Sequence, residues 1–182
     1  MKIVIKPNTY LYLAILLLLI PLPWLISWLI AVFFHEFCHW LGVKLGGGSV
    51  LQLTVGLSGA NMESTAMSER QRLLAVLSGP AGGLLLLLLA RWFPKIAICS
   101  WLLSMYNLLP VLPLDGGRAL QILLRRDRVF CTVERVLLFC LTLLAVYSAF
   151  FLKFGILPIM IISILWLKNR KSPCKEMICK VQ

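Results

Sequence analysis

The residues best suited to chemistry lie in one motif, F-F-H-E-F-C-H-W at residues 33–40. The motif is part of an apolar stretch that covers about residues 24–44. Side chains four residues apart project from one face of an α-helix, so His35 and His39 can bind one metal ion while Glu36 lies beside it. Two neutral imidazoles suit zinc, and a third protein ligand and a water complete a catalytic site. The sequence therefore predicts a zinc site that lacks one protein ligand.

The alternative is that the two histidines have helical spacing by chance and only pack against their neighbours. Glu36 counts against this alternative. An ionisable group inside a membrane helix costs about 2.5–3.5 kcal/mol on insertion scales and usually has a function. The chain contains only two histidines, and both lie in this motif.

Composition indicates an integral membrane protein. Of the 182 residues, 60% are hydrophobic, and the mean hydropathy is +0.93. Such values are typical of a polytopic membrane protein and not of a soluble domain. The net charge of +11 is compatible with nucleic-acid binding. The positions of the basic residues, however, indicate membrane topology, and we expect no nucleic-acid partner.

Apolar segments divide the chain into about six transmembrane helices. They cover roughly residues 10–20, 24–44, 73–91, 95–109, 129–152 and 154–167. After the second segment, Leu51, Leu53, Val55 and Leu57 alternate with polar or small residues, which predicts a short strand. We therefore expect an all-α membrane protein with a short membrane-associated β segment. Residues 1–182 form one integral membrane domain, with a core at about 24–124, helices five and six at about 129–167, and a basic tail at 168–182.

The distribution of basic residues predicts the orientation of these helices. If the six segments alternate across the membrane, fifteen of the eighteen lysines and arginines lie on one side. Only Arg91, Lys95 and Lys153 lie on the other side. The positive-inside rule then places both termini in the cytoplasm.

Asp115 is the best candidate for the third ligand. Of the seven acidic residues, only Glu36 and Asp115 are predicted to lie in apolar surroundings, whereas the other five fall in loops, the tail or a helix start. Asp115 follows the fourth segment at its cytoplasmic end, and at about 1.5 Å per residue its depth matches that of His35 and His39. The alternative is that Asp115-Gly116-Gly117 is only a turn.

Together, H-E-F-C-H and the segment N-L-L-P-V-L-P-L-D-G-G-R at residues 107–118 resemble the motifs of the site-2 protease family of intramembrane zinc metalloproteases. The likeness covers about residues 24–124 and is strongest to the bacterial stage IV sporulation protease branch. It implies zinc held by His35, His39 and Asp115 and Glu36 as the general base. Asn107 matches an asparagine that helps to orient substrate in the family.

The resemblance also implies what the protein acts on and where. The substrate would be a membrane-bound protein cut near the cytoplasmic face, such as a sporulation transcription-factor precursor, and the location would be a bacterial cell membrane. An inhibitory membrane protein is a candidate second partner. Because a helical substrate must unwind before cleavage, Leu51, Leu53 and Val55 are predicted to line an edge strand that aligns it.

Two features depart from the family pattern. The third segment has Gly79-Pro80 but lacks the asparagine that often follows. The sequence also contains neither an inserted PDZ domain nor a tail long enough for the nucleotide-binding CBS domain of the sporulation branch, so we expect no ATP regulation through such a domain. The competing function is a zinc-binding transporter or structural membrane protein without hydrolysis. It would explain the ligands but not Glu36, and the fifth and sixth segments offer few polar residues for a transport path.

Overall fold

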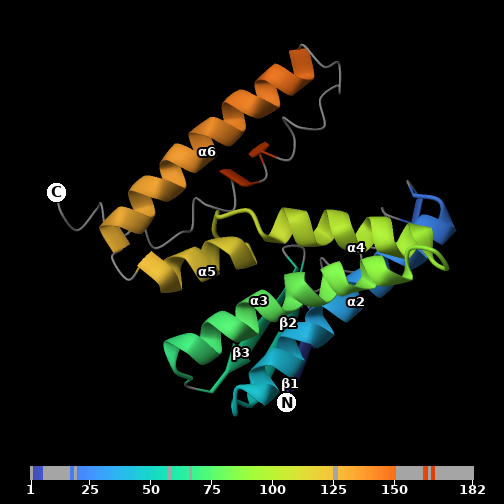
Figure 1. The fold of residues 1–182 in the computed structure, drawn as a ribbon, viewed down its shortest axis with the longest axis horizontal. Helices are drawn as coiled ribbons and strands as arrows, with labels where there is room; N and C mark the ends of the chain where they lie inside the picture. Colours follow the sequence, from blue (N-terminus) through green and yellow to red (C-terminus); the bar gives the residue numbers. More distant parts are fainter. Residues whose placement is uncertain are drawn as a thin grey trace. The chain divides into compact units, whose positions relative to one another are not determined.

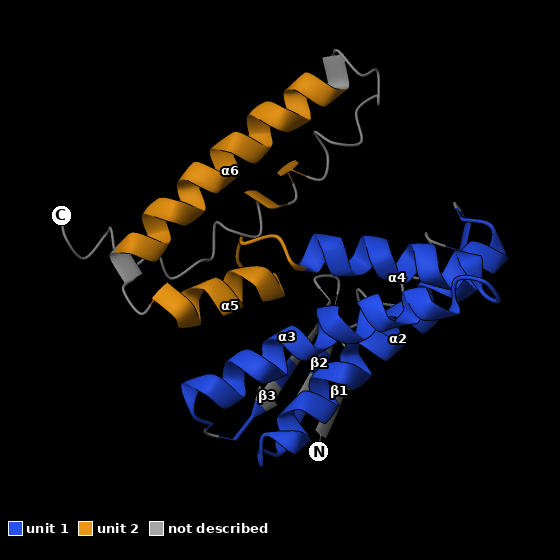
Figure 2. Cartoon of the chain, in the orientation of Figure 1, with its two compact units in different colours: residues 1–107 blue, residues 108–182 orange. Residues whose placement is uncertain are grey.

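The structure is a computed structural model that describes residues 2–5, 17–18, 20–56, 59–65, 67–124, 127–150, 162–163 and 165–166. Most of the first and sixth predicted spans, Leu57 and the basic tail lie outside these residues. The chain forms two compact units, residues 1–107 and 108–182 (Figure 2). The elements in chain order are β1 (Lys2–Ile5), α2 (Leu22–Leu45), β2 (Val50–Gly56), β3 (Gly59–Ser64), α3 (Glu69–Leu85), η1 (Leu86–Leu89), α4 (Pro94–Asn107), α5 (Asp115–Leu124) and α6 (Asp127–Phe150).

Helix α2 is the common partner of the other helices in the first unit. It packs against both α3 and α4, which also contact each other (Figure 1). Small residues occupy the interior of this group, because Ala31, Ala75, Ala97, Ser100 and Ser104 are all buried. Small side chains let helix backbones approach closely, which is how membrane helices gain packing contacts.

Three helical segments are long and apolar enough to cross a membrane: Leu22–Leu45, Glu69–Leu89 and Val129–Ser148. They correspond to the second, third and fifth predicted spans. Large apolar side chains on them face outward, for example Phe33 and Leu88, which are 74% and 75% exposed. Exposed apolar side chains on helices of this length are suited to contact with lipid. The protein is therefore a mostly helical membrane protein.

The fourth predicted span forms a helix of nearly the expected length that ends two residues earlier. Helix α4 has 14 residues and ends at Asn107, whereas the apolar pattern continues to Leu109. An upright crossing needs about 20 residues. The chain leaves the helix where Pro110 follows closely, because proline cannot continue the backbone hydrogen-bond pattern.

The predicted β segment is part of a larger sheet. Strand β2 lies where the alternation predicts a strand, but it pairs with β3 in antiparallel fashion and with β1 in parallel fashion. Neither partner was predicted. The four residues of β1 are too few to show alternation, and β3 contains glycine and asparagine, which have low strand propensity. These two strands therefore depend on pairing with β2.

This sheet order corrects the predicted role of β2. The order β1-β2-β3 places β2 in the centre, so both of its edges are already paired. The edge expected along Leu51, Leu53 and Val55 is therefore not available to an extended peptide. The reason is that an edge is a property of the sheet, and the alternation of one strand does not reveal its partners.

In the second unit, α5 packs against α6. The residues after Asp115 were predicted as a motif or turn, but they form helix α5. Its interface with α6 contains a buried cluster of Leu112, Phe130 and Cys131, against which Leu120 and Leu124 pack. The apolar side chains of α5 are thus buried by a helix distant in sequence, a contact that the motif does not reveal.

One acidic residue lies in surroundings that differ from the prediction. Glu134 was placed among the acidic residues of loops, tail and helix starts, but it lies inside α6 and is only 2% exposed. Its carboxylate accepts a hydrogen bond from the backbone N–H of Leu112 at 2.9 Å. A buried acid requires such partners, and the partner comes from a loop 22 residues away.

The start of α3 gives a test of the fold. Ser68 caps the helix and forms a reciprocal capping box with Gln71, with the Gln71 N–H donating to Ser68 Oγ and the Ser68 N–H donating to Gln71 Oε1. We expect Ser68→Ala to lower the free energy of unfolding by about 0.5–2 kcal/mol because one N–H loses its acceptor. Thermal or denaturant unfolding in detergent measures this. Arg72→Gln, at an exposed position of the same helix, is the control, and equal stability of the two variants would contradict the prediction.

Candidate metal centre

His35 and His39 project from the same face of α2, as their spacing predicts. Their Nε2 atoms are 3.1 Å apart, and the two rings are nearly perpendicular, at 84°. Two nitrogens that each bind zinc at about 2.0–2.1 Å in a tetrahedral arrangement lie roughly 3.3 Å apart. The distance between the two Nε2 atoms is therefore close to that of a pair of zinc ligands.

A hydrogen bond orients the ring of His39. Its Nδ1 lies 2.8 Å from the backbone carbonyl oxygen of Ala75 on α3. A carbonyl can only accept, so Nδ1 carries the proton, and in the neutral ring Nε2 keeps its lone pair. Histidines that bind metals commonly donate their other N–H in this way. The Ala75 carbonyl thus leaves Nε2 of His39 as the ring nitrogen that is able to bind a metal.

Helix α3 must approach α2 closely for this hydrogen bond to form. Gly79 is buried, and a methyl group at this position would overlap the imidazole of His39. Ser78 strengthens the same contact because its Oγ donates to the carbonyl oxygens of Cys38 and Ala75, both at 2.8 Å. In the sequence, Gly79 is notable only as part of the Gly79-Pro80 element that resembles the family pattern. The role of Ala75 has no signal in the sequence, since the backbone carbonyl acts and not the side chain.

Asn107, predicted to assist the site, lies next to the histidine pair. It is the last residue of α4, and its side-chain amide is 3.4 Å from Nε2 of His35. This long contact leaves the amide able to turn toward another partner when His35 uses Nε2 for a metal. The position beside a ligand suits a group that orients a bound molecule.

Asp115, the predicted third ligand, is the first residue of α5 and is 8% exposed. Asp115 belongs to the second unit, whereas His35 and His39 belong to the first. Two imidazole nitrogens and one carboxylate oxygen are a common ligand set of catalytic zinc. The residue types of the three candidate ligands therefore fit zinc.

Glu36 follows His35 directly on α2 and is half-buried. A residue next to a ligand on a helix points about 100° away from it around the axis. Glu36 therefore lies beside the metal-binding face and not on it, which suits a base and not a ligand. Its part in the reaction stays a prediction.

The substrate residues predicted on β2 are not grouped with the histidines by any described contact. Leu51 is 56% exposed, and the side chains of Leu53 and Val55 lie outside the described residues. Their role in binding substrate stays a prediction, without the edge pairing that the sheet order excludes.

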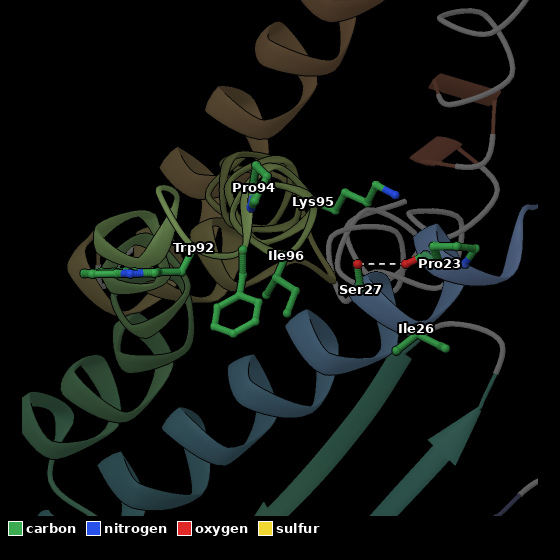
Figure 3. A pocket seen from close by; sticks show the side chains of 8 residues that line it. Pro23, Ile26, Ser27, Trp92, Pro94, Lys95 and Ile96 are labelled. Carbon is green, nitrogen blue, oxygen red and sulfur yellow. Dashed lines mark hydrogen bonds between the residues drawn. The ribbon is translucent and has the colours of Figure 1, made fainter.

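A shallow pocket of about 390 Å³ lies at the opposite end of α2 (Figure 3). Apolar side chains such as Ile26, Trp92 and Ile96 line it, together with Lys95. The hydroxyl of Ser27 donates to the Pro23 carbonyl at 2.8 Å, as the dashed line shows. None of its described lining residues is a histidine, cysteine or acid, so this pocket is not a metal centre.

The close contact at Gly79 predicts that Gly79→Ala weakens metal binding by about tenfold or more, because the methyl group displaces the His39 ring from the Ala75 carbonyl. Alanine has a higher helix propensity than glycine, so a poorer helix would not explain the loss. Zinc affinity measured by chelator competition tests this. Ala81→Ser, on an exposed position of the same helix, is the control. Unchanged affinity in Gly79→Ala would mean that the ring position does not depend on this contact.

The fold is similar to that of a solved structure, the Site-2 Protease from Methanocaldococcus jannaschii. The TM-score is 0.66 at 18% sequence identity, and the alignment covers 93% of this chain and 89% of that chain. Neither a protein-family model nor a curated protein matches the sequence. The chain therefore has the fold of a site-2 protease.

Proposed function

We propose that this protein is an intramembrane zinc metalloprotease of the site-2 type that hydrolyses a peptide bond of a membrane-bound protein near the cytoplasmic face. The histidine pair carries the proposal. Two Nε2 atoms lie 3.1 Å apart on a helix long enough to cross a membrane. A polar site inside an apolar helix costs free energy, so it is expected to have a function. The shared fold with a site-2 protease supports the same activity.

His35, His39 and Asp115 are the proposed zinc ligands. The residue types of all three, the 3.1 Å between the two Nε2 atoms and the proton on Nδ1 of His39 support this assignment. Zinc, when bound, polarises the scissile carbonyl and makes a water more acidic. Three protein ligands leave a coordination position open, as catalytic zinc sites require.

Glu36 is the proposed general base. It accepts the proton of the attacking water through its carboxylate and delivers that proton to the nitrogen of the leaving amine, so that one carboxylate serves both steps. Asn107 is the proposed orienting residue because its amide lies beside His35. Amide N–H groups donate hydrogen bonds and can hold a substrate carbonyl oxygen in place.

The substrate must present an extended segment to these residues, because a helix hides its peptide bonds. Such a segment can pair with an outer edge of the sheet, and among the described strands these edges belong to β1 and β3. The resemblance to the sporulation branch makes a membrane-tethered transcription-factor precursor the first substrate to test. The orientation with both termini in the cytoplasm of a bacterial cell membrane, and an inhibitory membrane partner, belong to the same proposal.

The role of Glu36 gives a direct test. We expect Glu36→Gln to reduce cleavage by roughly 10²- to 10⁴-fold, the usual contribution of a general acid or base. The amide cannot take a proton, but zinc content should stay within about twofold of wild type because the ligands are intact. Fragment formation from epitope-tagged, single-span membrane proteins in co-expressing cells measures cleavage, and metal analysis of the purified protein measures zinc.

The control is Glu69→Gln, which removes an exposed acid from the first turn of α3. If the wild-type protein holds zinc and Glu36→Gln leaves every activity unchanged, the results would favour the hypothesis of a zinc-binding transporter or structural protein. A folded wild-type protein without zinc would refute the metal centre itself.

The third ligand has its own test. We expect Asp115→Ala to weaken zinc binding by at least about 100-fold, more than the 10- to 100-fold typical of residues that only support a ligand. Chelator competition on the purified protein measures the affinity. Asp127→Ala, at the start of α6, is the matched removal of an acid. If Asp115→Ala kept the wild-type affinity, the third ligand would have to be another residue.

A further inference from the structure

Glu134 is a buried acid that the zinc chemistry does not use. It lies on α6, is 2% exposed, and is among the largest fully buried side chains of the described residues. Burial of a carboxylate is costly unless hydrogen bonds compensate for lost hydration. Phe130 and Leu138, one helical turn before and after Glu134, are buried and apolar, each 1% exposed. A leucine would therefore suit this face of α6 better than an acid.

The hydrogen-bond partner of Glu134 lies in the loop that precedes Asp115. Glu134 Oε1 accepts the backbone N–H of Leu112 at 2.9 Å. Within this loop, the N–H of Val111 donates to the Leu109 carbonyl at 2.8 Å and the N–H of Leu114 donates to the Val111 carbonyl at 3.0 Å. Pro110 and Pro113 have no N–H. Glu134 thus provides an acceptor for Leu112, whose N–H is not used by these internal turns.

The same loop packs tightly against α5 and α6. The side chain of Leu112 contacts Phe130 and Cys131 in a buried cluster. On the other side, a methyl group at Gly117 would overlap the backbone of Val111 and Leu112. Leu112 is therefore held through its backbone by Glu134 and through its side chain by α6. Its backbone also packs against Gly117 in the first turn of α5.

This constraint acts close to Asp115. Leu112 precedes Asp115 by three residues, and α5 begins at Asp115 itself. The N–H of Arg118 donates to the Leu114 carbonyl at 3.0 Å, which joins the end of the loop to the first turn of α5. A shift of Leu112 would therefore move the backbone that carries the Asp115 carboxylate.

We propose that Glu134 is a positioning residue that holds the loop at Leu112 so that Asp115 is presented to the metal. The inference rests on the proposed function, in which Asp115 is a zinc ligand. It explains why an acid occupies an apolar face of α6. Residues that orient a metal ligand typically contribute about 10- to 100-fold to metal affinity.

Three variants of the full-length protein in detergent test the proposal. Glu134→Leu removes the acceptor at similar volume, and we expect zinc affinity to fall about tenfold. Glu134→Gln keeps an oxygen that accepts the Leu112 N–H, and its affinity should stay within about threefold of wild type. Phe130→Leu loosens the same cluster without removing the hydrogen bond, and it shows how much a general loss of packing matters. Chelator competition measures zinc affinity, and thermal unfolding measures stability for each variant.

Hydrogen exchange gives a readout that does not depend on zinc. In the metal-free protein, Glu134→Leu should speed exchange of the Leu112 amide about tenfold or more, whereas Glu134→Gln should protect it nearly as well as wild type. If Glu134→Leu does not fold, Glu134→Asp replaces it, because this change withdraws the carboxylate by one methylene. We then expect the same loss of zinc affinity and the same faster exchange of the Leu112 amide. Loss of zinc affinity and of protection in the Leu or Asp variant, with rescue in Glu134→Gln, is the expected result.

Two results would overturn the proposal. The first is wild-type zinc affinity in a folded Glu134→Leu or Glu134→Asp protein. The second is an equal loss of affinity in Phe130→Leu at equal stability, which would reduce Glu134 to a packing residue. If wild type and Asp115→Ala still differ in zinc affinity, the proposed function stands in both cases. If wild type itself binds no zinc, the proposed function and the inference fail together.

Discussion

The hydrogen bond from Nδ1 of His39 to the Ala75 carbonyl is the interaction on which the proposed metal centre most depends. It selects the tautomer in which Nε2 can bind a metal, and it needs α3 to lie almost against the imidazole. Glycine at position 79 allows this approach. The packing of α2 on α3 and the chemistry of the histidine pair are therefore consequences of one close helix contact.

Each side of the proposed centre has its own local support. The histidines are held by α3 through a backbone carbonyl, whereas the loop before Asp115 is held by the buried carboxylate of Glu134. Inside a membrane protein, water is a poor source of hydrogen bonds, so polar groups that position ligands must be satisfied by the protein itself. Both supports follow this rule, and each joins elements that are distant in sequence.

The helix that carries His35 and His39 was the most predictable part of the molecule. Helical spacing places His35 and His39 on one face of α2. Apolar surroundings do not single out Asp115 in the same way, because Glu134 is also a buried acid with apolar neighbours. The second, third and fifth spans were predictable because a long apolar run in a membrane is expected to form a spanning helix. Strands β1 and β3 and helix α5 were not predicted. Each is stabilised mainly by a partner element, and a short segment carries little periodicity of its own.

The sequence by itself determined the apolar helices and the types and spacing of the candidate ligands, because these follow from local geometry and hydrophobicity. Only the tertiary structure decided which atoms support them. The Ala75 carbonyl has no signature in the sequence, Glu134 appeared to be an ordinary acid near a helix start, and β2 appeared to offer an edge that β1 and β3 in fact occupy. Backbone hydrogen bonds and strand neighbours arise when distant segments meet, and residue types along one segment do not specify them.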